Sequence, residues 1–90
     1  MHKIALDNQN LVQYSSHMAN LLAQLGRRIR ELRLEKSWSQ AELAAKAGVS
    51  RRFLVQIEAG EGNASLLRLA ELSEALGVSL VRLVAGLGAV

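Results

Sequence analysis

The sequence predicts a small all-α domain of five helices. Good helix-forming residues dominate the 90-residue chain and proline is absent. Apolar residues recur at intervals of three and four, and serine and glycine residues punctuate these runs where helices begin and end. Half of the residues are hydrophobic but only Trp38, Tyr14 and Phe53 are aromatic, so we expect an aliphatic core.

The composition also argues against several classes of function. The chain has no cysteine, which excludes disulfides and thiolate metal sites and fits a reducing compartment. No apolar run approaches the roughly 20 residues that cross a membrane, and residues 1–10 lack the apolar core of a signal peptide. His2 and His17 are isolated from other metal-ligating residues. We therefore expect a cytoplasmic protein with no cofactor, no metal and no membrane partner.

The first 22 residues are expected to form a helical N-terminal extension that precedes a domain at residues 23–86. Residues 1–10 show no firm periodicity and are interpreted as a mobile arm. From Leu11 to Leu32 apolar residues recur at threes and fours, which fits one long helix with a stripe suited to a helix-to-helix dimer contact. Alternatively, Ser15, Ser16 and Asn20 break the segment into a separate short helix folded onto the body. We favour the second interpretation.

The first helix of the domain is predicted at about residues 23–36. Leu25, Ile29 and Leu32 form its inward stripe, and its arginines are expected to point outward. Trp38 follows at the joint with the next helix. Its ring would bury more area than any neighbouring side chain, so we expect it to plug the core.

Two short helices follow between Ser39 and Gly60. Ser39 and Glu42 have the spacing of a capping box, and Gly48 can end the first of these helices in the left-handed conformation. Ser50 is the predicted N-cap of the second, and Gly60 is expected to close it. Its buried stripe consists of Phe53, Leu54 and Ile57, and its remaining face carries residues that a core does not require, namely Arg51, Arg52, Val55 and Gln56.

The C-terminal third of the chain predicts two more helices. After a loop at residues 61–64, Ser65 caps a helix that Gly77 ends, and Ser79 caps a last short helix at residues 80–85. Residues 87–90 form an uncharged apolar tail. Such a tail either packs at a dimer interface or leads into another domain in a longer protein.

The two central helices resemble the helix-turn-helix of the Cro/C1-type, phage-repressor-like (Xre) family. The resemblance rests on a small residue at Ala44, a glycine at Gly48 and apolar residues at Val49, Leu54 and Ile57, and it extends over about residues 25–85. It implies a compact lambda-repressor-like domain in which residues 51–59 enter the major groove of DNA. Many family members have proline where this chain has Ala64, which affects the rigidity of that loop.

Basic residues are concentrated between Arg27 and Arg52. This stretch contains eight basic and three acidic residues, a balance of +5, whereas the rest of the chain has three basic and five acidic residues, a balance of −2. A local excess of positive charge is the footprint of a protein that binds a polyanion. The alternative is a solvated helix face, since Arg27 and Glu31 are spaced for an i,i+4 pair.

The predicted DNA contacts divide into two sets. Arginine can bond two acceptors on guanine, glutamine matches adenine and valine can touch a thymine methyl, so the base-contacting set is Arg51, Arg52, Val55 and Gln56. The family resemblance implies a second set that contacts phosphate, for which Gln40 at the start of its helix is the main candidate. This phosphate set comprises Gln40, Ser50, Asn63 and Ser65.

The chain is not expected to be an enzyme. Glu58 has no second acid at useful spacing and no nucleophile–base pair nearby, so we expect it to form an internal ion pair with a base of one of the two preceding helices. The predicted function is a sequence-specific regulator of transcription, a repressor that binds double-stranded DNA at a palindromic operator as a homodimer. The helix at residues 80–85 with its tail is the preferred dimer surface, and the N-terminal extension is the alternative.

Three other functions are compatible with parts of the sequence. The chain resembles short antitoxins that bind their own operator and mask a toxin protein, and it resembles the DNA-binding part of larger, effector-sensing regulators. A purely protein-binding helical module is the third, but it predicts an uncharged outer face on residues 50–59, which Arg51 and Arg52 contradict.

Overall fold

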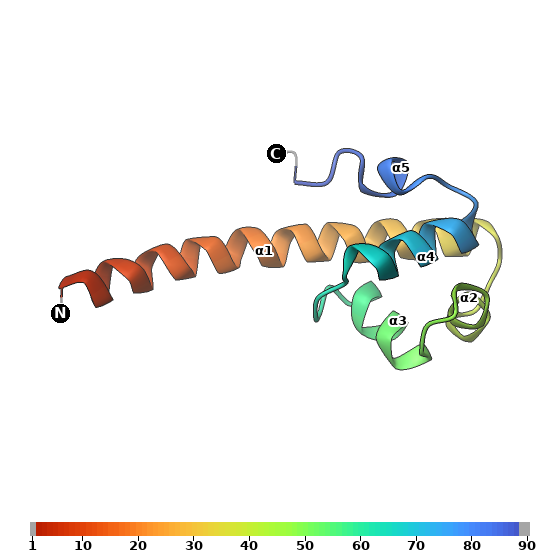
Figure 1. The fold of residues 1–90 in the computed structure, drawn as a ribbon, viewed down its shortest axis with the longest axis horizontal. Helices are drawn as coiled ribbons and strands as arrows, with labels where there is room; N and C mark the ends of the chain where they lie inside the picture. The colour runs from red at the N-terminus through yellow and green to blue at the C-terminus, as the bar shows by residue number, and fades with distance from the viewer. Residues whose placement is uncertain (1, 89–90) are drawn as a thin grey trace.

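Five helices make up the fold (Figure 1). The computed structural model describes the backbone of residues 2–88 and the side chains of residues 17–88. The helices are α1 (His2–Glu35), α2 (Gln40–Ala47), α3 (Arg51–Glu58), α4 (Leu66–Leu76) and α5 (Leu80–Val84). No strand occurs within residues 2–88, which confirms the all-α prediction. None of these helices carries an apolar stretch long enough to cross a bilayer.

Helix α1 is continuous over 34 residues, so the predicted mobile arm and the predicted break into a separate short helix are both wrong. Serine and asparagine disfavour a helix interior by less than about 0.7 kcal/mol each, which is too little to interrupt a run that lacks proline. At 1.5 Å per residue the helix is about 51 Å long, which equals the longest dimension of the molecule, 51 Å. Its N-terminal half extends past the other helices in Figure 1.

The predicted N-caps are confirmed. Ser39, Ser50, Ser65 and Ser79 each accept a hydrogen bond from a backbone N–H three residues later. At α2 the capping box is complete, because the N–H of Ser39 also donates to the Glu42 carboxylate at 2.9 Å. This bond is the main reason that the pKa of Glu42 lies below its ordinary value. The associated stability is present above the ordinary pKa and is lost as the pH falls through the lowered one.

The core is aliphatic, as predicted. Each helix contributes at least one fully buried side chain, and these are Ile29, Leu43, Leu54, Ile57, Leu72, Leu76 and Leu83. Trp38 and Phe53 are partly buried and pack against this core. Two lysines approach the Trp38 ring, with Lys36 Nζ at 5.3 Å and Lys46 Nζ at 4.9 Å from its centroid. Trp38 therefore packs against the core, and the ammonium groups of two lysines lie within cation–π distance of its ring.

Helices α1 and α3 cross at unusually short range. A Cβ atom on Gly26 would lie 2.6 Å from the carbonyl oxygen of Glu58 and would also collide with that of Ile57. Gly60, just beyond α3, has a φ of +77°, and a Cβ there would lie 3.1 Å from the Cα of Ala23. Glycine at these two positions lets the C-terminal end of α3 rest directly on the backbone of α1.

The C-terminal segment lies against its own domain. Leu87 packs against the core, and the N–H of Gly88 donates to Oε1 of Gln24 at 2.9 Å. Arg28 donates to the carbonyl oxygens of Arg82 and Ala85, both at 3.0 Å, and so satisfies the end of α5. The expectation that the arginines of α1 point outward is therefore wrong for Arg28. Residues 89–90 of the predicted tail lie outside the described part of the chain.

The crossing of α1 and α3 predicts an unusual response to Gly26→Ala. Replacing glycine by alanine inside a helix normally raises stability by about 0.5–1 kcal/mol. Here we expect a loss of about 1–3 kcal/mol, because the methyl group would push two carbonyl groups away. Urea denaturation measures the difference. Asn20→Ala, at an exposed position of the same helix, is the control and should leave stability unchanged or slightly higher; a gain for Gly26→Ala would disprove the close approach.

Candidate nucleic-acid interface

Helix α3 has one buried side and one exposed side. Its N-terminus is fixed by Ser50, whose Oγ accepts from the N–H of Phe53 at 3.0 Å. Leu54 and Ile57 are buried at 0% and 2% exposure. The four side chains predicted to contact bases all lie on the exposed side: Arg51, Arg52, Val55 and Gln56. The helix thus presents two guanidinium groups, an amide and an apolar group to solvent.

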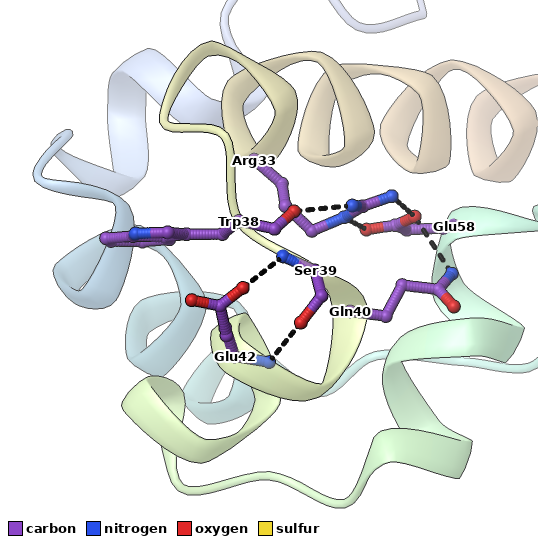
Figure 2. Close-up of polar contacts among 6 residues, drawn as sticks. All are labelled: Arg33, Trp38, Ser39, Gln40, Glu42 and Glu58. Carbon is purple, nitrogen blue, oxygen red and sulfur yellow. Dashed lines mark hydrogen bonds and ion pairs between the residues drawn. The ribbon is translucent and has the colours of Figure 1, made fainter.

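The C-terminal end of α3 is held by a buried ion pair (Figure 2). Arg33 Nε donates to Glu58 Oε2 at 2.7 Å, and Arg33 Nη2 donates to Glu58 Oε1 at 2.8 Å. The side chains are only 9% and 4% exposed. The remaining terminal nitrogen of Arg33, Nη1, donates to the carbonyl oxygen of Trp38 at 2.8 Å. This bidentate geometry is the strong form of an ion pair between arginine and a carboxylate.

The ion pair confirms the expected structural role of Glu58 and corrects the expected orientation of Arg33. Leu25, Ile29 and Arg33 follow one another at intervals of four, so Arg33 continues the buried stripe of α1. The hydrogen bonds with Glu58 raise the pKa of the guanidinium above its ordinary value, although burial alone would lower it. Within the described residues no buried side-chain nitrogen or oxygen lacks a partner.

Gln40 extends this network to α2. Its Nε2 donates to Glu58 Oε1 at 3.1 Å, and the side chain is only partly exposed. The amide group that was predicted to reach a phosphate thus links the start of α2 to the end of α3. The first backbone N–H groups of a helix have no partner within it, and at α2 these groups belong to Gln40 and Ala41.

An open hollow lies between α1, α2 and α3. Its volume is about 420 Å³, and its lining residues are Arg30, Arg33, Gln40, Val55, Glu58 and Ala59. Arg30 is exposed and lines the same hollow as the predicted base-contacting residue Val55. The sequence prediction treated Arg30 only as part of a basic face. Its distance of three residues from Arg33 is the signal that places it on this side of α1.

The other predicted phosphate contacts are exposed and flank α3. Ser50 precedes the helix, and Asn63 and Ser65 lie in and after the loop that follows it. The hydroxyl groups of both serines serve as caps, with Ser65 Oγ accepting from the N–H of Arg68 at 3.2 Å. The predicted contacts therefore border α3 at both ends.

The structure divides the eight basic residues between Arg27 and Arg52 by role. Arg28 and Arg33 are bound to groups inside the domain, and two lysines lie over Trp38. The remaining four are exposed and form no ion pair within the described residues: Arg27, Arg30, Arg51 and Arg52. The i,i+4 pair predicted for Arg27 and Glu31 is absent from residues 17–88. Positive charge is thus available on α3 and on the adjoining part of α1.

Comparison with known proteins finds a helix-turn-helix family and regulators of transcription. Residues 29–83 match the model of the helix-turn-helix family. An uncharacterized HTH-type transcriptional regulator, y4dJ of Sinorhizobium fredii, is 42% identical over 60 residues, which cover 67% of this chain and 78% of that protein. The immunity repressor protein of Bacillus phage phi105 is 38% identical over 60 residues, but these span only 42% of its length.

A solved structure shows the same arrangement of helices. The restriction-modification controller protein C.AhdI from Aeromonas hydrophila superposes with a TM-score of 0.67 at 37% sequence identity. The match covers 69% of this chain and 94% of that protein. The family match begins at Ile29, so residues 2–28 of α1 lie outside it.

The buried ion pair predicts that Arg33→Met is strongly destabilising. The substitution leaves the Glu58 carboxylate buried without its counter-charge, which costs about 3–5 kcal/mol. We expect this loss, or complete unfolding, in a urea titration. Arg30→Met removes an exposed arginine from the same helix and should change stability by no more than about 0.5 kcal/mol. Equal effects of the two substitutions would show that the ion pair does not hold α1 and α3 together.

Proposed function

Since the chain belongs to the Cro/C1-type helix-turn-helix family of DNA-binding transcription regulators, a non-enzymatic class, we propose that it is a sequence-specific repressor that binds a palindromic operator as a homodimer. The observation that carries the proposal is the exposed side of α3, where Arg51, Arg52, Val55 and Gln56 face solvent. We assign its action to the cytoplasm.

The major groove of DNA accommodates an α-helix, and the residues near the N-terminus of a recognition helix reach the base edges. In this chain Arg51 and Arg52 occupy those positions and can each bond two acceptors of guanine. Gln56 lies one turn further along and can pair with adenine, whereas Val55 offers an apolar contact to a thymine methyl. The 41% exposure of Val55 supports this role, since a large apolar side chain is left uncovered beside two arginines.

Phosphate contacts would surround this reading surface. The N–H groups at the start of α2, near Gln40, and the polar residues Ser50, Asn63 and Ser65 are the proposed contacts. We add Arg30, which is exposed and lines the same hollow as Gln40 and Val55. Because the side-chain amide of Gln40 already donates to Glu58, the backbone N–H of Gln40 is the more direct phosphate contact.

A dimer follows from the small size of the reading surface. Helix α3 has eight residues and reaches only a few base pairs, and each mismatched pair costs about 1–3 kcal/mol. Two copies on a palindrome double the number of bases read. Their recognition helices would enter the groove about 34–36 Å, or one turn of DNA, apart.

A second function is favoured by one observation. Leu66, Leu67 and Val81 are 70%, 68% and 76% exposed on α4 and α5. A contiguous exposed apolar patch is typical of a surface that binds protein, and the neighbouring Leu66 and Leu67 are the candidates for the centre of such a patch. An antitoxin that masks a toxin with this surface, or the DNA-binding part of a larger effector-sensing regulator, is therefore the alternative to an independent repressor.

The substitutions Arg51→Ala and Arg52→Ala test whether α3 contacts the bases of DNA. The cognate site is first selected from a random DNA pool, which also reveals whether it is palindromic. If an arginine reads a base, its removal should cost about 1–3 kcal/mol on the selected site and much less on random DNA. Equal losses on both DNAs would assign that arginine to phosphate, and Arg82→Ala on α5 is the control. If both variants bind the selected site as tightly as the unmodified protein, α3 is not part of the interface.

The electrostatic part of the proposal predicts a steep dependence on salt. The logarithm of the association constant should fall linearly with the logarithm of salt concentration, with a slope of about −0.9 for each phosphate neutralised. Fluorescence anisotropy of a labelled duplex measures this slope. Arg30→Ala should make it shallower by about one unit if Arg30 contacts phosphate. A flat response of the unmodified protein would contradict DNA binding through these basic residues.

A further inference from the structure

The hollow between α1, α2 and α3 brings a carboxylate to the proposed DNA surface. Its lining includes Glu58 together with Arg30, Gln40 and Val55, three residues that the proposed function places at DNA. A carboxylate that faces a phosphate repels it, because both groups are negatively charged. A protein that binds DNA here therefore needs the charge of Glu58 to be covered on the side of the hollow.

Two side chains donate to the oxygens of Glu58. Arg33 Nε donates to Oε2 at 2.7 Å and Arg33 Nη2 donates to Oε1 at 2.8 Å, so the guanidinium occupies one position on each oxygen. Gln40 Nε2 donates to Oε1 as well, at 3.1 Å. A carboxylate oxygen accepts about two hydrogen bonds. The Gln40 amide therefore fills the position on Oε1 that Arg33 leaves open.

Gln40 meets the carboxylate from the side of α2. Figure 2 shows Arg33 and Gln40 reaching Glu58 from two different helices. The Glu58 side chain is only 4% exposed, whereas Gln40 is partly exposed, and both residues line the hollow. On the wall of the hollow the neutral amide is thus the more accessible of the two groups.

The alternative is that the Gln40 amide leaves Glu58 for a phosphate when DNA binds. It would exchange one anionic acceptor for another, so the bond itself gains little. The move would also take a donor from a buried carboxylate oxygen, which is unfavourable, and would uncover that charge beside the phosphate. Other donors are available to the phosphate, namely the exposed guanidinium of Arg30 and the first backbone N–H groups of α2.

We infer that the Gln40 side chain is a positioning residue, which keeps its hydrogen bond to Glu58 in the DNA complex and covers that carboxylate while the backbone at the start of α2 meets the phosphate. The inference rests on the proposed DNA-binding function and concerns the same site. The side chain ties the first residue of α2 to the last residue of α3. It therefore fixes the phosphate-contacting end of α2 relative to the helix that is proposed to read bases.

Nuclear Overhauser effects test the position of the side chain directly. The hydrogen bond brings the amide protons of Gln40 near the Hγ protons of Glu58, so we expect a cross-peak between them in the free protein. The cross-peak should persist when the duplex with the selected site is added in excess. Its loss in the complex, while the domain stays folded, would overturn the inference.

A pair of matched substitutions tests what the amide contributes. Gln40→Met has nearly the same size but cannot donate, so its unfolding equilibrium constant in urea should rise about tenfold, as expected when a hydrogen bond to a charged group is lost. Its affinity should also fall about tenfold, equivalent to about 1.4 kcal/mol, on the selected site and on random DNA alike, because a phosphate contact carries no sequence information. Gln56→Met, exposed on α3, is the control and should leave stability unchanged and weaken the selected site only.

Two results for Gln40→Met would overturn the positioning role. Reduced affinity with unchanged stability would assign the amide to a phosphate. Reduced stability with unchanged affinity would show that the bond to Glu58 serves the fold alone.

The dependence on salt separates covering of the carboxylate from a purely structural effect. If the uncovered carboxylate repels phosphate, the affinity lost in Gln40→Met should be largest at low salt and should shrink as salt screens the two charges. The same loss at every salt concentration would overturn the covering role.

The inference and the proposed function fail separately. The cross-peak of the free protein and the urea titrations are measured without DNA. If the unmodified protein binds neither a selected site nor random duplex, the DNA-binding function is wrong whatever these measurements give. If it binds its selected site but the cross-peak disappears on binding, only the inference is wrong.

Discussion

The ion pair between Arg33 and Glu58 is the contact on which the arrangement of the domain depends. It joins α1 to the last residue of α3, and through Gln40 and the Trp38 carbonyl it also fixes the start of α2. A buried ion pair gains little over an apolar contact of the same shape, because both charges lose water. Its value lies in geometry: three donors of one guanidinium fix the distance and angle between α1 and α3. We interpret it as the element that sets the angle of α3, the proposed recognition helix.

The ion pair and the close backbone contacts that join α3 to α1 lie at the C-terminal end of α3. Glu58 is bound by Arg33, the carbonyls of Ile57 and Glu58 rest on Gly26, and Gly60 lies against Ala23. The opposite end carries Arg51 and Arg52 in solvent. A helix held at its C-terminus leaves its N-terminal turn free to enter a groove, and it is this turn that reaches base edges in the helix-turn-helix geometry. The division between a structural end and a proposed base-reading end therefore follows from where two glycines and one acid occur in the sequence.

The sequence correctly predicted those features of the structure that depend only on residues close together in the chain. The serine caps, the left-handed glycines Gly48 and Gly77, and the exposed side of α3 were all predictable, because each depends on residues within one turn of helix. The roles of Arg28 and Arg33 were not, since a charged residue is assigned to the surface unless its partner is known. The partners on other helices, which are Glu58 for Arg33 and the carbonyls of Arg82 and Ala85 for Arg28, are 25 or more residues away. The break in α1 was predicted from serine and asparagine residues, which disfavour a helix only weakly. The place of Arg30 in the candidate site depends on a hollow that forms only where α1, α2 and α3 pack together.

The central claim is that the exposed side of α3, with the start of α2 beside it, is the surface that meets DNA. Backbone amide chemical shifts, recorded by NMR while a duplex carrying the selected site is added, test this claim residue by residue. The account predicts the largest changes at residues 50–56 and at Gln40 and Ala41, with little change at residues 80–84 of α5. Changes concentrated on α4 and α5, with α3 unaffected, would contradict it.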